Sequence, residues 1–225
     1  MATATARTIP PPSDKPKNLA DLVERLGDIP LERILLQAPP GTATEQDVLA
    51  ARATPEKRLC ELVDGVLVEK AMGTRESWLA VLLIHHLMTF LEQHDLGLVL
   101  GADGMLRFFS GRVRIPDVSF LSWERLPGRE LPDSPIADLV PDLAVEVLSK
   151  GNTKKEMARK LRDYFQAGVR LVWLVDPKSQ AVDVYTSATK KKRLTRNQIL
   201  EGGEVLPGFT LPLRQLFTPS RRATP

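Results

Sequence analysis

The chain has 225 residues with 43% hydrophobic and 26% charged residues and a net charge of +3, which fits one globular domain with at most a small appendage. The N-terminus has no apolar core of a secretory signal, and the most apolar stretch, residues 78–91, is interrupted by two histidines and is too short to span a membrane. Cys60 is the only cysteine, which excludes an internal disulfide and a cysteine-based zinc site, so we expect a soluble, cytoplasmic protein with no membrane partner.

The two ends of the chain differ in composition from its middle. Residues 1–18 are rich in Pro, Ser and Thr, and we expect a disordered tail there and a second one over 218–225. Residues 19–58 carry short helical patterns separated by IPLE and APPG and predict a helical N-terminal extension. The remaining residues, 59–217, form the expected domain.

The domain begins with a hairpin pattern. In ELVDGVLVEK apolar and polar residues alternate around Asp64-Gly65, which is a strong signal for a two-residue turn. An apolar helix follows over about residues 74–93. After it, LVLG, MLRFF and RIPDVSFLS predict three short strands.

The segment from Pro141 to Pro177 predicts a strand, a helix and a strand. Residues 142–148 form the first strand, Thr153 and Glu156 form a capping box, and Gly168 ends the helix. The nearly all-apolar run 170–175 is typical of a strand covered on both faces. A connection of this length predicts a parallel, right-handed crossover and hence an α/β fold.

The C-terminal part continues with a strand over 177–185, a basic loop at KKKRLTR and a short helix in LPLRQLF. Residues 150–196 hold thirteen Lys and Arg against four Asp and Glu, a net charge of +9, whereas the rest of the chain is −6. Such asymmetry indicates a polyanionic partner, although a solvated basic surface would give the same count. The candidate phosphate contacts are Lys150, Lys154, Lys190, Lys191, Lys192 and Arg193.

Two carboxylates stand out in the strands. Because strand side chains alternate, Glu146 shares a face with Ala144 in the middle of a covered strand, where an unpaired charge costs several kcal/mol. Asp117 directly follows Pro116 at the start of DVSFL. A structural ion pair for Glu146 and a locally hydrogen-bonded turn for Asp117 are the alternatives to a functional role.

The helix between the strands contributes a lysine. At 100° per residue, Lys160 falls on the margin of the apolar stripe, from where it can reach over the sheet toward Glu146 or extend into solvent. The stripe comprises Met157, Ala158, Leu161, Tyr164 and Phe165, and the expected solvated face comprises Lys155, Arg159 and Arg162.

Two acids and a lysine at one edge suit metal-dependent phosphodiester hydrolysis. Hard carboxylate oxygens of Asp117 and Glu146 would hold Mg²⁺ or Mn²⁺, which polarises the phosphoryl oxygen and acidifies a bound water. Lys160 would steady that water or the charge developing on the phosphate. The three residues are our candidate catalytic set.

The order of five motifs resembles that of a known family. ELVDGVLVEK, RIPDVSFLS, PDLAVEVLS, a K-x-x-x-Y pair before AGVRLVWLVDP, and VLPGFTLPLRQLF are together similar to the Uma family of endonucleases, within the restriction-endonuclease-like PD-(D/E)XK superfamily. The resemblance covers about Leu59 to Phe217. It implies a mixed sheet flanked by helices, with Asp117 and Glu146 as metal ligands.

One position departs from the superfamily's pattern. The lysine that usually stands two residues after the glutamate is Leu148 here, and the resemblance implies a relocated lysine, Lys160. Glu61 matches an acidic position of the family and is a further candidate metal ligand, although an exposed hairpin glutamate is the common case.

Three functions remain to be distinguished. The first is an active Mg²⁺- or Mn²⁺-dependent endonuclease acting on nucleic acid, with DNA as the expected substrate and a homodimer kept open as its assembly. The second is a catalytically silent nuclease fold that binds nucleic acid or a protein partner. The third is a structural, dimer-forming protein.

Overall fold

The computed structural model describes residues 16–218, so the tail predictions for 1–15 and 219–225 lie outside the described residues. Its centre is a six-stranded sheet in the order β11-β10-β9-β8-β7-β4, in which only β8 and β9 run parallel. These strands are β4 (Gly97–Leu100), β7 (Val118–Ser122), β8 (Leu143–Val147), β9 (Leu171–Asp176), β10 (Ala181–Tyr185) and β11 (Lys191–Thr195). The sheet is therefore mixed, as the family resemblance implied.

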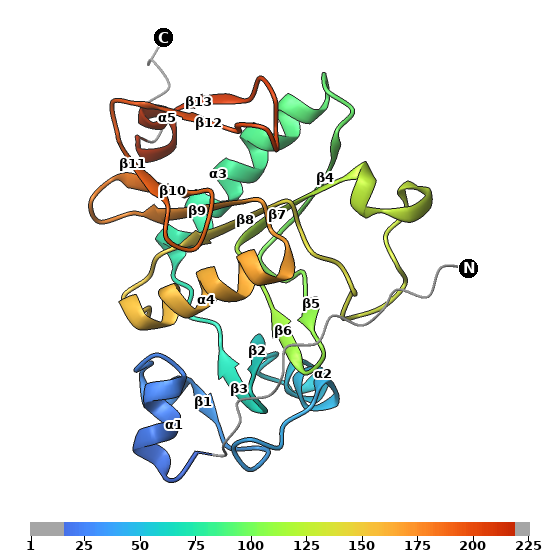
Figure 1. Ribbon diagram of the computed structural model, residues 1–225, viewed down its shortest axis with the longest axis vertical. Helices are drawn as coiled ribbons and strands as arrows, with labels where there is room; N and C mark the ends of the chain where they lie inside the picture. The colour runs from blue at the N-terminus through green and yellow to red at the C-terminus, as the bar shows by residue number, and fades with distance from the viewer. Residues whose placement is uncertain (1–15, 219–225) are drawn as a thin grey trace.

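Helices cover both faces of this sheet (Figure 1). α3 (Thr74–Leu91) and α5 (Leu213–Phe217) lie on one face, next to the small β12 (Ile199–Glu201) and β13 (Thr210–Pro212) ladder, and α4 (Lys154–Ala167) lies on the other. Strand alternation decides which side chains each helix meets. Val145 and Trp173 pack in the core that includes α3, whereas Ala144 and Val172 pack in the core that includes α4. Glu146 therefore points toward α4.

The β8-α4-β9 crossover forms as predicted. The Thr153 side chain accepts a hydrogen bond from the Glu156 backbone N–H at 3.0 Å, which caps the first turn of α4. The helix ends at Gly168, whose φ of 100° lies in the left-handed region that favours glycine. The register pairs Leu143 with Leu171 and Val147 with Val175, which brings the ends of both strands to the same edge.

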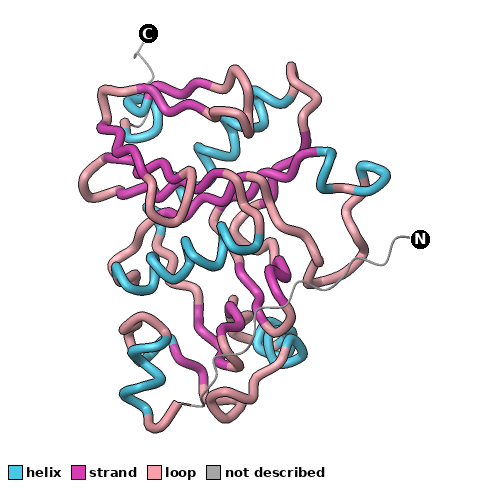
Figure 2. The backbone as a smooth tube through the Cα atoms, viewed as in Figure 1, coloured by secondary structure: helices cyan, strands magenta, loops and turns pink. Residues whose placement is uncertain are grey.

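A second sheet lies beyond α4 (Figure 1 and Figure 2), and its strands stand in the order β1-β3-β2-β6-β5. Its hairpin turns at Asp64 and Gly65, both with positive φ (50° and 70°), as the sequence predicts for a two-residue turn. Its strands are β1 (Ile34–Leu35), β2 (Cys60–Val63), β3 (Val66–Glu69), β5 (Leu106–Phe109) and β6 (Arg112–Arg114). Short 3-10 turns at Trp123–Arg125 and Pro127–Arg129 follow β7.

The N-terminal segment is tied to the domain. It contains α1 (Leu19–Arg25), a 3-10 turn (Leu31–Arg33) and α2 (Glu45–Ala53), but also strand β1, so helices are not its only elements. Gly27 lies so close to the start of α4 that a Cβ there would come within 2.5 Å of the Glu156 backbone nitrogen. Buried Arg33 reaches the Glu156 carboxylate at 2.8 and 3.0 Å. Residues 25–33 thus contact the first turns of α4.

Two of the predicted elements were wrong. RIPDVSFLS is two strands, β6 and β7, because the chain leaves the second sheet before Pro116, which cannot donate a ladder hydrogen bond, and enters the first after it. KKKRLTR is strand β11 and not a loop, because its backbone pairs with the whole of β10.

On α4, Ala158 is exposed although it was placed in the apolar stripe. Arg159 is half-buried although it was placed on the solvated face, because the hairpin and α1 cover that side of the helix. Within the described residues, no helix is both long enough and apolar enough to cross a membrane.

Candidate active site

Asp117 and Glu146 meet where the pairing of β7 and β8 ends. The ladder pairs Val118 with Val145, and one residue further Asp117 stands opposite Glu146. The Val147 backbone N–H donates to Asp117 Oδ2 at 2.6 Å, so the side chain takes the place that a strand partner would fill. Both carboxylates are almost completely buried, at 4% and 5% exposure. The structure therefore brings the two predicted acids together at the buried end of the β7–β8 ladder, which we call the strand edge.

Lys160 reaches Glu146 from α4, as the helical spacing predicted. Its ammonium lies 3.1 Å from each oxygen of the Glu146 carboxylate and 3.0 Å from Glu61 Oε1. The Tyr164 hydroxyl, one turn further along the helix, donates to Glu146 Oε1. Lys160 and Tyr164 are buried, so both side chains contact Glu146 and not solvent. We call Asp117, Glu146, Lys160 and Tyr164, together with Lys70 described below, the cluster.

Glu61 connects the cluster to a network of ion pairs in the second sheet. Its Oε2 lies 2.8 Å from Arg114 Nη1, and its Oε1 accepts the Ile115 backbone N–H at 3.1 Å. Arg114 also binds Asp163 on α4, and Arg112 binds the other Asp163 oxygen at 2.6 Å. We call these four residues, Glu61, Arg112, Arg114 and Asp163, the Arg114 network.

Burial and neighbouring charges shift the pKa values in opposite directions. Burial raises the pKa of Glu146, and the Asp117 and Glu61 carboxylates raise it further against the lowering effect of Lys160. Burial would also raise the pKa of Glu61, but Lys160 and Arg114 together lower it to about 2. For Lys160, burial lowers the pKa, but the Glu146 and Glu61 charges outweigh it and the pKa rises. Of these two carboxylates, Glu146 is therefore the one whose charge the protein stabilises less.

Lys70 is a site residue that the sequence analysis missed. Its ammonium lies 2.8 Å from Asp117 Oδ1 and donates to the Ala102 carbonyl at 3.2 Å. The signal was present in the hairpin, because pairing of Glu61 with Val68 places Glu61 and Lys70 on one face. Arg114 and Asp163 were missed because each is buried only by contact with a distant segment.

The donor set fits a divalent cation at Asp117 and Glu146. Asp117 Oδ1 is buried and accepts no hydrogen bond within the described residues, since the Lys70 contact has ion-pair distance without hydrogen-bond geometry. Mg²⁺ is commonly held by one or two carboxylates, with water and phosphate oxygens completing its shell. Between residues 16 and 218, no three His, Cys, Asp or Glu side chains form a ready metal cluster. To become a third metal ligand, Glu61 would have to give up its ion pair with Arg114 or with Lys160.

The comparisons with known proteins identify the family of the chain. A family model described as "Putative restriction endonuclease", Uma2, matches residues 46–214, which is most of the chain. The chain belongs to the Uma2 family. The comparison with curated proteins finds no match.

A solved structure shares the fold. It is described as a "putative nuclease belonging to DUF820" from Anabaena variabilis, with a TM-score of 0.66 and 18% identity over 77% of this chain and 97% of that chain. The family description and the shared fold both support a nuclease function. The Uma2 match begins at residue 46, so the N-terminal segment that packs on α4 lies outside it.

The predicted phosphate contacts of this Uma2 chain fall into two groups. Lys150 and Lys154 are exposed near the start of α4, whereas Lys190 to Arg193 lie on or beside edge strand β11, three strands and hence about 14 Å from β8. Lys191 and Arg193 bind Asp183 on β10 at 2.8 and 3.0 Å. Asp183 is already counted in the net charge of +9, so these ion pairs leave that number unchanged but occupy two of the predicted phosphate contacts.

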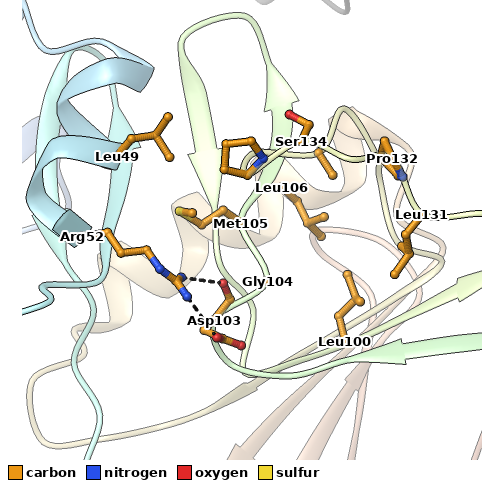
Figure 3. A pocket seen from close by; sticks show the side chains of 12 residues that line it. Leu49, Arg52, Leu100, Asp103, Gly104, Met105, Leu106, Leu131, Pro132 and Ser134 are labelled. Atoms are coloured by element: carbon orange, nitrogen blue, oxygen red, sulfur yellow. Dashed lines mark hydrogen bonds and ion pairs between the residues drawn. The ribbon is translucent and has the colours of Figure 1, made fainter.

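A cleft of about 320 Å³ lies elsewhere on the molecule (Figure 3). Leu49, Leu100, Met105 and Leu106 line it, and the Arg52 guanidinium contacts Asp103 at its rim. None of the acidic or lysine residues of the cluster lines it. We therefore place the candidate chemistry at the strand edge and not in this cleft.

Proposed function

We propose that this protein is a metal-dependent endonuclease that hydrolyses phosphodiester bonds, with DNA as its substrate. The observation that carries the proposal is the pair of buried carboxylates, Asp117 and Glu146, facing each other with Asp117 Oδ1 accepting no hydrogen bond among the described residues. Membership of the Uma2 family and the nuclease fold support the reaction class.

In this proposal Asp117 and Glu146 hold Mg²⁺ or Mn²⁺, and Glu61 is a further ligand only if it exchanges one of its cationic partners. An ion bound there would stabilise negative charge on the phosphoryl oxygens and would lower the pKa of a bound water. Lys160 holds both Glu146 oxygens and thereby orients the carboxylate, and its charge stabilises negative charge that develops near it. Tyr164 fixes the same carboxylate from the side of α4.

Substrate would be drawn by the basic residues outside the cluster. Lys150 and Lys154 stand closest in sequence to the strand edge and the start of α4 and carry no ion pair within the described residues, so we propose them as phosphate contacts. Lys190, Lys191, Lys192 and Arg193 would extend the contact along the sheet edge. Neutralised phosphates release counterions, so affinity should fall steeply with salt.

A plasmid-nicking assay tests the proposal directly. Wild-type protein should convert supercoiled DNA to the open circle with Mg²⁺ or Mn²⁺ and not with EDTA. Glu146→Gln and Asp117→Asn should show no conversion, with Lys178→Met, an exposed lysine in the β9–β10 turn, as the active control. Conversion by both carboxylate variants at the wild-type rate would contradict the assignment.

A catalytically silent module is the second candidate, because the ammonium groups of Lys70 and Lys160 already neutralise both carboxylates. A protein of that kind would bind DNA equally with and without metal and leave it intact. The nicking assay, run beside a gel-shift titration with EDTA, distinguishes the two candidates.

We further propose a cytoplasmic homodimer. Trp78, Val81 and Met88 are about half exposed at helical spacing along α3 and form an apolar stripe. Arg75 and Glu92 stand at its opposite ends, so antiparallel packing of two copies would place each arginine beside the partner's glutamate.

Light scattering should give twice the monomer mass for wild type. Arg75→Glu and Glu92→Arg should each give monomer, and the double variant should recover the dimer.

A further inference from the structure

Lys70 occupies the position on Asp117 that a metal ion would need. Its side chain is only 4% exposed, and its ammonium lies 2.8 Å from Asp117 Oδ1. The backbone fixes this placement, because the Lys70 N–H donates to the Leu59 carbonyl at 2.8 Å and extends the hairpin ladder by one residue. Asp117 itself cannot turn away without giving up the Val147 N–H. The contact is therefore built into two anchored elements.

The two lysines of the cluster are held differently. Lys160 lies between two carboxylates, with both Glu146 oxygens and Glu61 Oε1 at 3.0–3.1 Å. Lys70 has one carboxylate and the Ala102 carbonyl as its partners among the described residues. Lys70 therefore has fewer bonds to lose if its ammonium is displaced, and its four-carbon stem lets the charge move without moving the backbone.

We propose that Lys70 is a built-in placeholder for the metal: its ammonium neutralises Asp117 in the metal-free protein and competes directly with the divalent cation for Oδ1. This inference rests on the proposed function, since it takes Asp117 as a ligand. Two cations cannot share one carboxylate oxygen at contact distance without strong repulsion, so the ion binds only when the ammonium withdraws. Lys70 acts through Asp117 and is a positioning residue.

The competition can be measured without any substrate. Free Mn²⁺ gives an electron paramagnetic resonance signal that is lost on binding, so a titration of the full chain gives the dissociation constant. Lys70→Met keeps the apolar stem and removes the charge, and it should bind Mn²⁺ roughly tenfold more tightly or better. Lys70→Arg, which keeps the charge, should return the affinity to near that of wild type.

Thermal melting gives a second readout. Without metal, Lys70→Met leaves the buried Asp117 carboxylate without its partner and should melt below wild type, and Mn²⁺ should raise its melting temperature by more than it raises that of wild type. Lys70→Gln repeats the test should the methionine variant fail to fold. Lys178→Met removes one exposed positive charge that pairs with none of the site residues and should change neither readout, which controls for net charge.

The outcomes separate this inference from the proposed function. If wild type binds Mn²⁺, Asp117→Asn does not, and Lys70→Met binds it no more tightly than wild type, the placeholder role is overturned and the metal site stands. If wild type and Lys70→Met both fail to bind Mn²⁺, the metal site and the placeholder are both wrong. Tighter binding by Lys70→Met but not by Lys178→Met supports both.

Discussion

Two regions of buried charge in this protein differ in how well their charges are balanced. In the Arg114 network each carboxylate oxygen of Glu61 and Asp163 has an Arg, Lys or backbone N–H partner. At the strand edge, Asp117 Oδ1 accepts no hydrogen bond among the described residues, and burial raises the pKa of Glu146 despite Lys160. Because both regions are buried and charged, our proposal places the function where the charges are imbalanced and not wherever charge is buried.

The largest contrast should come from removing charge at the strand edge. Glu146→Gln keeps an oxygen that can accept from Lys160 and Tyr164, so the fold should survive while metal-dependent cleavage is lost. Because the pKa of Glu146 is raised in the folded state, its ionisation costs stability as pH rises through that pKa. Metal-free Glu146→Gln should therefore melt at or above wild type at neutral pH, measured by calorimetry. A variant that melts far below wild type would make Glu146 a structural ion-pair member.

The opposite behaviour is expected in the Arg114 network. Arg114→Met leaves the buried Glu61 and Asp163 carboxylates without their main partner and should lower the free energy of unfolding by about 3–5 kcal/mol. Arg170→Met removes a half-exposed partner of Asp142 and should cost less than about 1 kcal/mol. Urea denaturation measures both, and a loss for Arg114→Met as small as that for Arg170→Met would show that the Arg114 network adds little to stability.

Acid should weaken the network in a defined range. The pKa of Glu61 falls from 4.5 to about 2 on folding, because Lys160 and Arg114 outweigh the raising effect of burial. Its contribution to stability is complete above pH 4.5 and is lost as pH falls toward 2. The free energy of unfolding of wild type should decline over this range, and that of Glu61→Gln should decline less. Parallel curves would show that other groups cause the acid transition.

Several parts of this organisation follow from the sequence because they depend on local rules. The Asp64-Gly65 turn, the capping box at Thr153 and the left-handed Gly168 each need a particular residue at one place. The reach of Lys160 to Glu146 follows from strand and helix periodicity. These features are encoded within a few residues and can be predicted without the fold.

The remaining features depend on long-range packing. By its helical spacing Arg159 belongs to the solvent-exposed face of α4, and it is half-buried only because the hairpin and α1 cover it. β11 looks like a charged loop, because its strand character comes from pairing with β10 and not from its own KKKR run. Lys70 and Asp117 lie far apart in sequence and meet only when the end of the hairpin reaches the start of β7.

Lys160 connects the two regions, and its removal should affect both moderately. Lys160→Met should retain Mn²⁺ binding and lower the cleavage rate by about 100-fold or more, the scale for one preorganised charged group. It should also lower stability, because Glu61 and Glu146 lose their shared partner. Single-turnover nicking at saturating Mn²⁺ measures the rate, and an unchanged rate would confine Lys160 to a structural role.

The smallest effect is expected at the surface. Lys190→Gln and Lys192→Gln remove exposed charges on or beside β11 and should weaken DNA binding modestly. The slope of affinity against salt should fall by about one for each phosphate that the variant no longer neutralises. Fluorescence anisotropy over a range of salt concentrations tests this. A slope unchanged in both variants would move the nucleic-acid surface away from β11.

The most direct test of the central claim is anomalous diffraction from a crystal soaked in Mn²⁺. We expect one strong peak roughly 2.0–2.6 Å from Asp117 Oδ1 and from a Glu146 oxygen, with the Lys70 ammonium moved off Asp117. A map with no peak at this edge, and with Lys70 and Lys160 still paired with the two carboxylates, would contradict the account.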